Sequence, residues 1–178
     1  MLLKNAKNYM RAHLFKTSGT AYGFLPITDM GGASAYMTDI AVGNIVEISF
    51  GDSASTGNGY IIIGSGSTPA TENDYALESR ITSGLSVVSY TPSKETDANG
   101  NVIKRFDFTL QNTSGSDITI AEVGIRYYIQ GYRTGAGTTG STKNGFILFE
   151  RTVLSTPVTI AAGDAAAIRY TVESAENN

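Results

Sequence analysis

The sequence predicts an all-β protein, an antiparallel β-sandwich that can take the form of a jelly roll, with a short helical or extended N-terminal arm. Short segments rich in Ile, Val, Tyr and Phe alternate with polar, glycine-bearing turns along most of the chain. The intervals between these segments lack helical periodicity, which argues against a parallel sheet. Charged residues are only 16% of the total, and Gly, Ser, Thr and Asn fill the gap, as is typical of short strands joined by many turns.

The arm is assigned to residues 1–35 and a single β-sandwich domain to residues 36–178, because a chain of 178 residues is typical of one domain. A short helix is predicted over residues 5–15, where apolar side chains recur on one face. So short a helix is marginal in water and needs a partner, either the body or a neighbouring chain. Residues 17–44 are expected to be extended, with at most a short strand at Tyr36–Ile40.

Two strands are predicted next. Val46, Ile48 and Phe50 alternate with polar residues, which is the period of a half-buried strand. A polar turn is expected at residues 52–59. The run Tyr60–Ile63 is apolar throughout and therefore indicates a strand that is buried on both faces.

The chain is organised around the stretch that follows, residues 64–79. Its glycines allow a sharp turn, and Thr71 and Asp74 have the spacing of a capping box, with Asp where Glu or Gln is usual. We predict a glycine elbow followed by about one turn of helix, with Tyr75 and Leu77 packed into a core. An ordinary capped turn is the alternative.

The middle of the chain predicts a hairpin. The strand-like residues Leu85–Tyr90 are followed by a connector, Pro92–Asn101, in which Asn99-Gly100 is the strongest hairpin signal of the chain. The next strand is expected at Val102–Gln111. Its apolar side chains share one face: Phe106, Phe108 and Leu110.

Residues Ile118–Ile129 form the longest strand candidate, and their apolar pattern changes face near Glu122. One extra residue there, a β-bulge, would restore a single inward face. Without a bulge, Glu122 points inward and needs a cationic partner, Arg151 or Arg126, because an unpaired buried carboxylate is costly. In either case we expect Glu122 to have a structural role.

A loop and three further strands are predicted after residue 130. Residues 131–145 are predicted to form a loop, with Tyr132 and Arg133 at its base as a candidate contact surface, since both residue types favour interfaces. Phe146–Leu154 is apolar on both faces and predicts a central strand. Two further strands are expected at Pro157–Ile160 and Ala165–Glu173.

Residue types that usually carry catalysis or bind metals are scarce. The chain has one histidine, His13, and no cysteine, which argues against zinc sites and His-based triads. The glycine-rich residues 135–143 fail as a phosphate loop, because Lys143 does not follow the glycine directly and a strand comes next. The oxygen-bearing turn at residues 97–101 lacks the closing carboxylate of an EF-hand. No catalytic, cofactor-binding or metal-binding residue is assigned, and an enzyme is not expected.

Charge is unevenly distributed along the chain. Residues 1–28 hold four basic residues and no acidic one, for a charge of +4, and the remainder holds nine basic and sixteen acidic residues, for −7. A basic arm on an acidic body predicts that Lys4, Lys7 and Arg11 dock onto an acidic partner surface. The alternative is a solvated terminus. Four charges without interleaved aromatic residues do not support nucleic-acid binding.

No export or membrane signal is visible in the sequence. The first residues lack the apolar core of a signal peptide. No run approaches the ~20 apolar residues of a membrane span. We therefore expect a protein that is made in a cytoplasm and has no membrane partner.

Three pieces of the sequence form a pattern by their order and spacing. They are Gly64-x-Gly66-x-Thr68-Pro69 with Asp74-Tyr75-x-Leu77, then Ile118–Ile125 with its Glu-Val-Gly-Ile end, then Phe149–Val153 with Pro157–Ile160 and Gly163-Asp164. This pattern resembles small structural proteins of tailed-bacteriophage virions. The resemblance implies a non-enzymatic virion component, made in the host cytoplasm, that forms homo-oligomers and contacts capsid or tail subunits. Head decoration and fibre are favoured over neck and tail.

The alternative function is a β-sandwich module that binds a host glycan or surface protein through the loops at residues 52–59 and 131–145. The chain has no Trp, but its 10 Tyr residues can supply aromatic platforms for sugars. Binding that survives deletion of the arm would favour this alternative.

Overall fold

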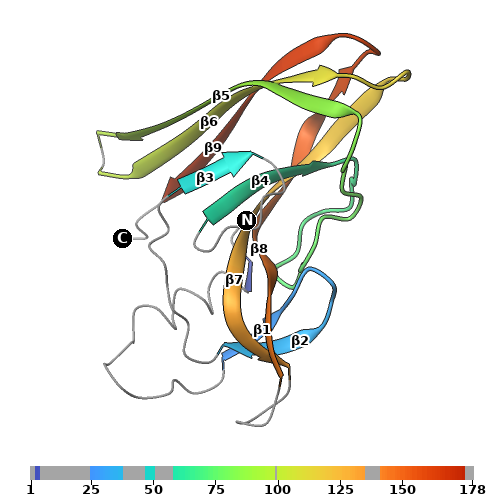
Figure 1. Ribbon diagram of the computed structural model, residues 1–178. Coiled ribbons are helices and arrows are strands. Elements are labelled where there is room, and N and C mark those ends of the chain that lie inside the picture. Colours follow the sequence, from blue (N-terminus) through green and yellow to red (C-terminus); the bar gives the residue numbers. More distant parts are fainter. Residues whose placement is uncertain are drawn as a thin grey trace. The chain divides into compact units, whose positions relative to one another are not determined.

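The computed structural model describes residues 3–4, 25–37, 47–50, 58–98, 100–134 and 141–174, and the structural statements below refer to these residues. In this part the chain forms nine strands (Figure 1): β1 Leu25–Thr28, β2 Ser34–Met37, β3 Glu47–Phe50, β4 Asn58–Gly64, β5 Leu85–Thr96, β6 Val102–Asn112, β7 Ile118–Thr134, β8 Ser141–Ile160 and β9 Ala165–Ser174. No helix in these ranges has the length and apolar character of a membrane span.

The chain divides into two compact units. Unit 1 comprises Met1–Ile81 and Ile120–Pro157, and unit 2 comprises Thr82–Thr119 and Val158–Asn178. The strands form two sheets with mostly antiparallel pairing. The predicted all-β class is confirmed, and the two sheets are consistent with a β-sandwich.

β7 is the central strand of the six-stranded sheet. The strand order is β1-β2-β7-β4-β3, and β8 also pairs with β7. β4 pairs with β7 in antiparallel register, with Ile61 opposite Ile125, whereas β3 and β4 are parallel. Every residue from 120 to 127 is buried, as expected for a strand that is covered on both faces.

The register of β7 against β4 contains no bulge as far as Glu122, where this pairing ends. The pairing of β4 with β7 is continuous from Gly59 opposite Tyr127 to Gly64 opposite Glu122. Because both faces of β7 are buried here, apolar side chains occur on both of them. Glu122 therefore points inward, which is the second of the two arrangements expected from the sequence.

The core of unit 1 brings together side chains that are distant in the sequence. Ile62 from β4 and Leu148 from β8 form one buried cluster with Leu3 and Leu77. The rings of Tyr127 and Phe149 lie 4.5 Å apart between centroids and join β7 to β8. The strand predicted at Phe146–Leu154 is thus present as part of β8, which continues without interruption through the separately predicted strand Pro157–Ile160. In the described sheet β8 pairs with β7 alone, so the central position expected for this strand is wrong.

The three-stranded sheet in unit 2 has the order β5-β6-β9 and is antiparallel throughout. β5 and β6 form the long hairpin in Figure 1, and its turn contains Gly100 with a φ of +87°. The predicted connector begins too early, because β5 extends to Thr96 and includes Pro92. Proline is tolerated there because β5 is an edge strand, where one backbone N–H group has no ladder partner to lose.

The apolar face predicted for β6 is confirmed. Phe106, Phe108 and Leu110 are all buried. Phe106 stacks on Tyr170 of β9, with 6.4 Å between ring centroids. The opposite face is polar, and there Arg169 donates from Nε to Asp107 Oδ1 over 2.6 Å.

Candidate functional site

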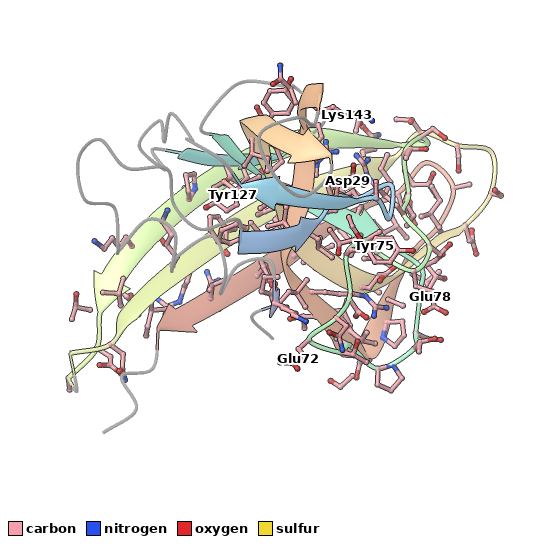
Figure 2. All side chains as sticks on the ribbon, turned by 90° about the horizontal axis from the view of Figure 1, so that it is seen from below. Asp29, Glu72, Tyr75, Glu78, Tyr127 and Lys143 are labelled. Atoms are coloured by element: carbon pink, nitrogen blue, oxygen red, sulfur yellow. The ribbon has the colours of Figure 1, made fainter. Side chains whose placement is uncertain are left out.

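The segment Gly64–Arg80, which we call the elbow loop, follows β4 and closes on itself. A single β-bridge joins Gly64 to Arg80, and the Ser65 N–H donates to the Ser79 carbonyl over 2.8 Å. Between these ends the loop contains turns and no helix, so the predicted helical turn is wrong. Figure 2 labels Glu72, Tyr75 and Glu78, three side chains of this loop.

The carboxylate of Glu122 on β7 holds both ends of the elbow loop. Its Oε1 atom accepts from the N–H groups of Gly66 and Ser79, over 3.2 and 2.8 Å. Its Oε2 atom accepts from the Glu78 N–H over 3.1 Å and from Arg151 Nε over 2.8 Å. These four hydrogen bonds explain why a carboxylate that is 0% exposed is stable in this position.

Arg151 on β8 extends the network from Glu122 to the middle of the loop. Its Nη1 atom donates to Asp74 Oδ2 over 2.6 Å, and its Nη2 atom donates to the Thr68 carbonyl over 3.1 Å. Nη2 also lies 3.6 Å from Glu78 Oε2. The planar guanidinium thus contacts the loop at three points, a geometry that lysine does not provide.

Asp74 and Glu78 each bind a threonine of the same loop. The Thr71 N–H and hydroxyl donate to the Asp74 carboxylate over 3.0 and 2.7 Å. The Thr68 N–H and hydroxyl donate to the Glu78 carboxylate over 2.8 and 2.7 Å. The Thr71–Asp74 contact is the carboxylate half of a capping box, formed in a loop that contains no helix. Thr68 and Glu78 are ten residues apart, so their contact instead ties two distant parts of the loop together.

The electrostatic effects follow from these contacts. Burial alone would raise the pKa of Asp74, but hydrogen bonds from Thr71 and Arg151 outweigh it and keep that pKa below its ordinary value. Hydrogen bonds from Thr68 lower the pKa of Glu78. Burial would lower the pKa of Arg151, but Asp74 and Glu122 raise it. All these pKa shifts favour the charged forms, so Asp74, Glu78 and Arg151 are ionised at neutral pH.

Two glycines allow the loop to approach Glu122 closely. A Cβ atom on Gly64 would lie 2.6 Å from the Ser79 carbonyl oxygen and closer still to Glu122 Oε1. A Cβ atom on Gly66 would lie 2.7 Å from Glu122 Oε1 and 2.5 Å from Glu78 Cβ. Any side chain at these positions would push the loop away from the carboxylate.

The arrangement is suited to holding structure together. Both oxygens of Glu122 are committed to the loop and to Arg151, and neither points at an open site. Among the described residues no group of three His, Cys, Asp or Glu side chains has the arrangement of a metal site. The network fixes the elbow loop to β7 through Glu122 and to β8 through Arg151.

A hollow of about 470 Å³ lies over the network. It is lined by parts of the elbow loop and by Arg151, and Tyr75 is at its margin. The prediction that Tyr75 packs into a core is wrong, because this side chain is 44% exposed. Its ring lies against the β1–β2 turn, where a Cβ atom on Gly32 would be 3.3 Å from it. Leu77 is buried as predicted.

The residues proposed from the sequence as an interface are not brought together in the described part of the chain. Lys4 is exposed, and its N–H donates to the Glu72 carbonyl over 2.8 Å. Tyr132 and Arg133 belong to β7, and Arg133 pairs with Tyr36 of β2. Lys7, Arg11 and His13 lie outside the described residues.

Sequence reasoning found the Glu122–Arg151 pair but missed the partners of Arg151 in the loop. Asp74 was interpreted only as a local cap, and Glu78 was not singled out. The available signal is the presence of three acids, Glu72, Asp74 and Glu78, in a stretch that also contains Gly64 and Gly66. Nothing in the spacing, however, connects that stretch to Arg151.

Comparisons with known proteins were made for the whole chain. No protein-family model, curated protein or solved structure matches it. The functional argument therefore depends on the residues of this chain.

Proposed function

We propose that this chain is a non-enzymatic structural component of a tailed-phage virion, which assembles in multiple copies and docks on capsid or tail subunits through its N-terminal arm. The observation that supports this function is the convergence of three sequence pieces. The piece at residues 64–77, the piece containing Glu122 and the piece containing Arg151 meet in one buried network. The residues that resemble phage structural proteins are thus the ones that build this part of the fold.

The chemistry of the network favours a structural role over catalysis. Buried ion pairs add little net stability, but they penalise alternative packings in which one partner is left alone. Three connections fix the elbow loop: to Glu122, to Arg151 and to its own threonines. A loop fixed in this way gives a rigid surface, which a subunit that contacts neighbours in an assembly requires.

Particles purified from the natural source test the proposal directly. The protein should be found in tailed particles by mass spectrometry, and antibodies against it should label one position, such as the head surface or the fibres. Absence of the protein from purified particles would overturn the virion assignment.

Light scattering of the purified protein tests the assembly step. Full-length chain and chain lacking residues 1–16 are compared at equal concentration. A stable oligomer that requires these residues supports self-assembly through the arm. A monomer in both cases would contradict self-assembly and leave docking on a different subunit as the role of the arm.

A second candidate function is a module that binds a host glycan or surface protein, and Tyr75 favours it. An exposed aromatic ring beside a hollow with acidic groups is a common arrangement for stacking on a sugar and binding its hydroxyls. The described residues that line this hollow belong to the elbow loop and, with Arg151, to β8. The loop predicted at 131–145 is shorter than expected, because β7 extends to Thr134 and β8 begins at Ser141. A glycan array with the parent protein and Tyr75→Ala tests this candidate, since signal lost only in the variant would support it.

A further inference from the structure

The segment around Leu3 fills a socket in unit 1. Leu3 is 0% exposed and belongs to one buried cluster with Ile62, Leu77 and Leu148. Met30, from the turn after β1, packs against the same cluster. The walls of the socket therefore come from β4, β8, the elbow loop and the β1–β2 turn, and Leu3 closes it.

Two backbone hydrogen bonds hold this plug in register. The Leu3 N–H donates to the Phe149 carbonyl of β8 over 3.1 Å, and the Lys4 N–H donates to the Glu72 carbonyl of the elbow loop over 2.8 Å. One apolar side chain and two main-chain bonds form a compact recognition unit. Such a unit can be supplied by any chain that presents the same short sequence.

Charge also favours this seat for the arm. The elbow loop contributes Glu72, Asp74 and Glu78 and has no basic residue before Arg80. Residues 1–28 contain no acidic residue, and their basic residues are Lys4, Lys7, Arg11 and Lys16. The attraction between the two segments does not depend on whether they belong to one chain.

The tether between plug and body is long. Twenty residues, 5–24, separate Lys4 from the start of β1. Fully extended, they would span roughly 66–72 Å. A folded chain of this length has a radius of gyration of about 16 Å. The plug can therefore reach the socket of its own body or that of an adjacent copy.

We infer that the Leu3 plug is exchanged between copies of this chain, so that one copy seats its Leu3 and Lys4 in the socket of the next. This inference rests on the proposed function and deepens it by naming a second copy as the partner of the arm. Leu3 and Lys4 make the same contacts whether they bind the socket of their own chain or that of another copy. Short linkers give effective concentrations in the mM range, and close-packed copies in an assembly supply a comparable local concentration.

A disulfide between plug and socket tests the exchange. The described residues contain no free cysteine and the sequence has none, so each introduced thiol is unique. Chains carrying Lys4→Cys are mixed with chains carrying Glu72→Cys, unfolded, refolded together at about 1 mM, and oxidised. The Lys4 N–H donates to the Glu72 carbonyl over 2.8 Å, so the two backbones are adjacent, as a disulfide between these positions requires. A disulfide-linked dimer of the two chains is expected on a non-reducing gel.

Two matched controls separate exchange from random collision. Adding Leu3→Asp to the Lys4→Cys chain should reduce the dimer by about ten-fold or more, because the buried leucine is what seats the plug. Replacing the Glu72→Cys chain with Lys94→Cys, at an exposed position of β5, should give the same low level. Equal dimer yields in all mixtures would overturn the inference.

The double variant Lys4→Cys/Glu72→Cys completes the test. If it closes only within one chain and the mixture gives no dimer, the plug stays with its own body and exchange is wrong. If neither forms a disulfide, the plug is not seated at Glu72 and exchange is also wrong. Neither result changes whether the protein is found in tailed particles, so the two proposals can fail separately.

Discussion

The Oε2 atom of Glu122 lies 2.8 Å from the Nε atom of Arg151, and this ion pair joins the two longest strands, β7 and β8. The side chains are 0% and 4% exposed. Neither charged group is solvated by water, so removing one of them would leave the other buried without its partner. The position of the elbow loop depends on the same two side chains.

Glu122→Gln should destabilise the protein by about 3–5 kcal/mol, because it removes the buried negative charge that faces Arg151 Nε and removes one acceptor from the loop. Urea unfolding followed by fluorescence measures the change. Arg169→Gln breaks the exposed pair with Asp107 and serves as the control, with little change expected. Equal effects of the two variants would contradict the importance of the buried pair.

Gly64→Ala should destabilise the protein by about 1–3 kcal/mol, because the added methyl group has no room between Glu122 and the Ser79 carbonyl. Gly115→Ala is the matched control, since a Cβ atom there would meet nothing within 4 Å. Thermal unfolding of both variants checks the prediction. If Gly64→Ala leaves the unfolding temperature unchanged, the loop does not approach Glu122 as closely as described.

Tyr75→Ala should cost less than about 1 kcal/mol, as expected for a largely exposed side chain. Leu77→Ala, two residues further on, should cost about 2–5 kcal/mol because Leu77 is part of the core of unit 1. Unfolding both variants in urea side by side gives the comparison. A larger loss of stability for Tyr75→Ala than for Leu77→Ala would mean that Tyr75 packs in the core, as the sequence predicts.

Stability should fall as the pH drops below about 4, and Asp74 should contribute to this fall. Its pKa in the folded protein is lower than its ordinary value of 3.8, so the unfolded chain takes up the proton first. The stabilisation is therefore present above the ordinary pKa and is lost as the pH falls through the folded one. Unfolding midpoints between pH 7 and pH 2 measure the slope. Identical slopes for the parent and Asp74→Asn would contradict the contribution of Asp74.

The fold class and one half of the site could be predicted from the sequence. Alternation along Val102–Gln111 gives the buried face of β6, because strand periodicity is a local property. The inward position of Glu122 follows from a similar local argument. Its need for a cation then reduces the choice of partner to Arg151 or Arg126.

The elbow loop could not be predicted in the same way. The local pattern at Thr71 and Asp74 fits the start of a helix, yet Asp74 is bound by Arg151, 77 residues further along the chain. That tertiary contact outweighs the weak helical preference of a few residues. Without the helical turn, Tyr75 lies against the β1–β2 turn instead of in the core.

The separation between Asp74 and Arg151 also has a consequence for the order of folding. The elbow loop is synthesised well before Arg151, and contacts between distant residues form late because closing long loops costs entropy. An incomplete chain still lacks β8, and with it Leu148 and the Phe149 carbonyl that receive Leu3. A nascent or truncated polypeptide that ends before β8 therefore lacks a complete socket for Leu3.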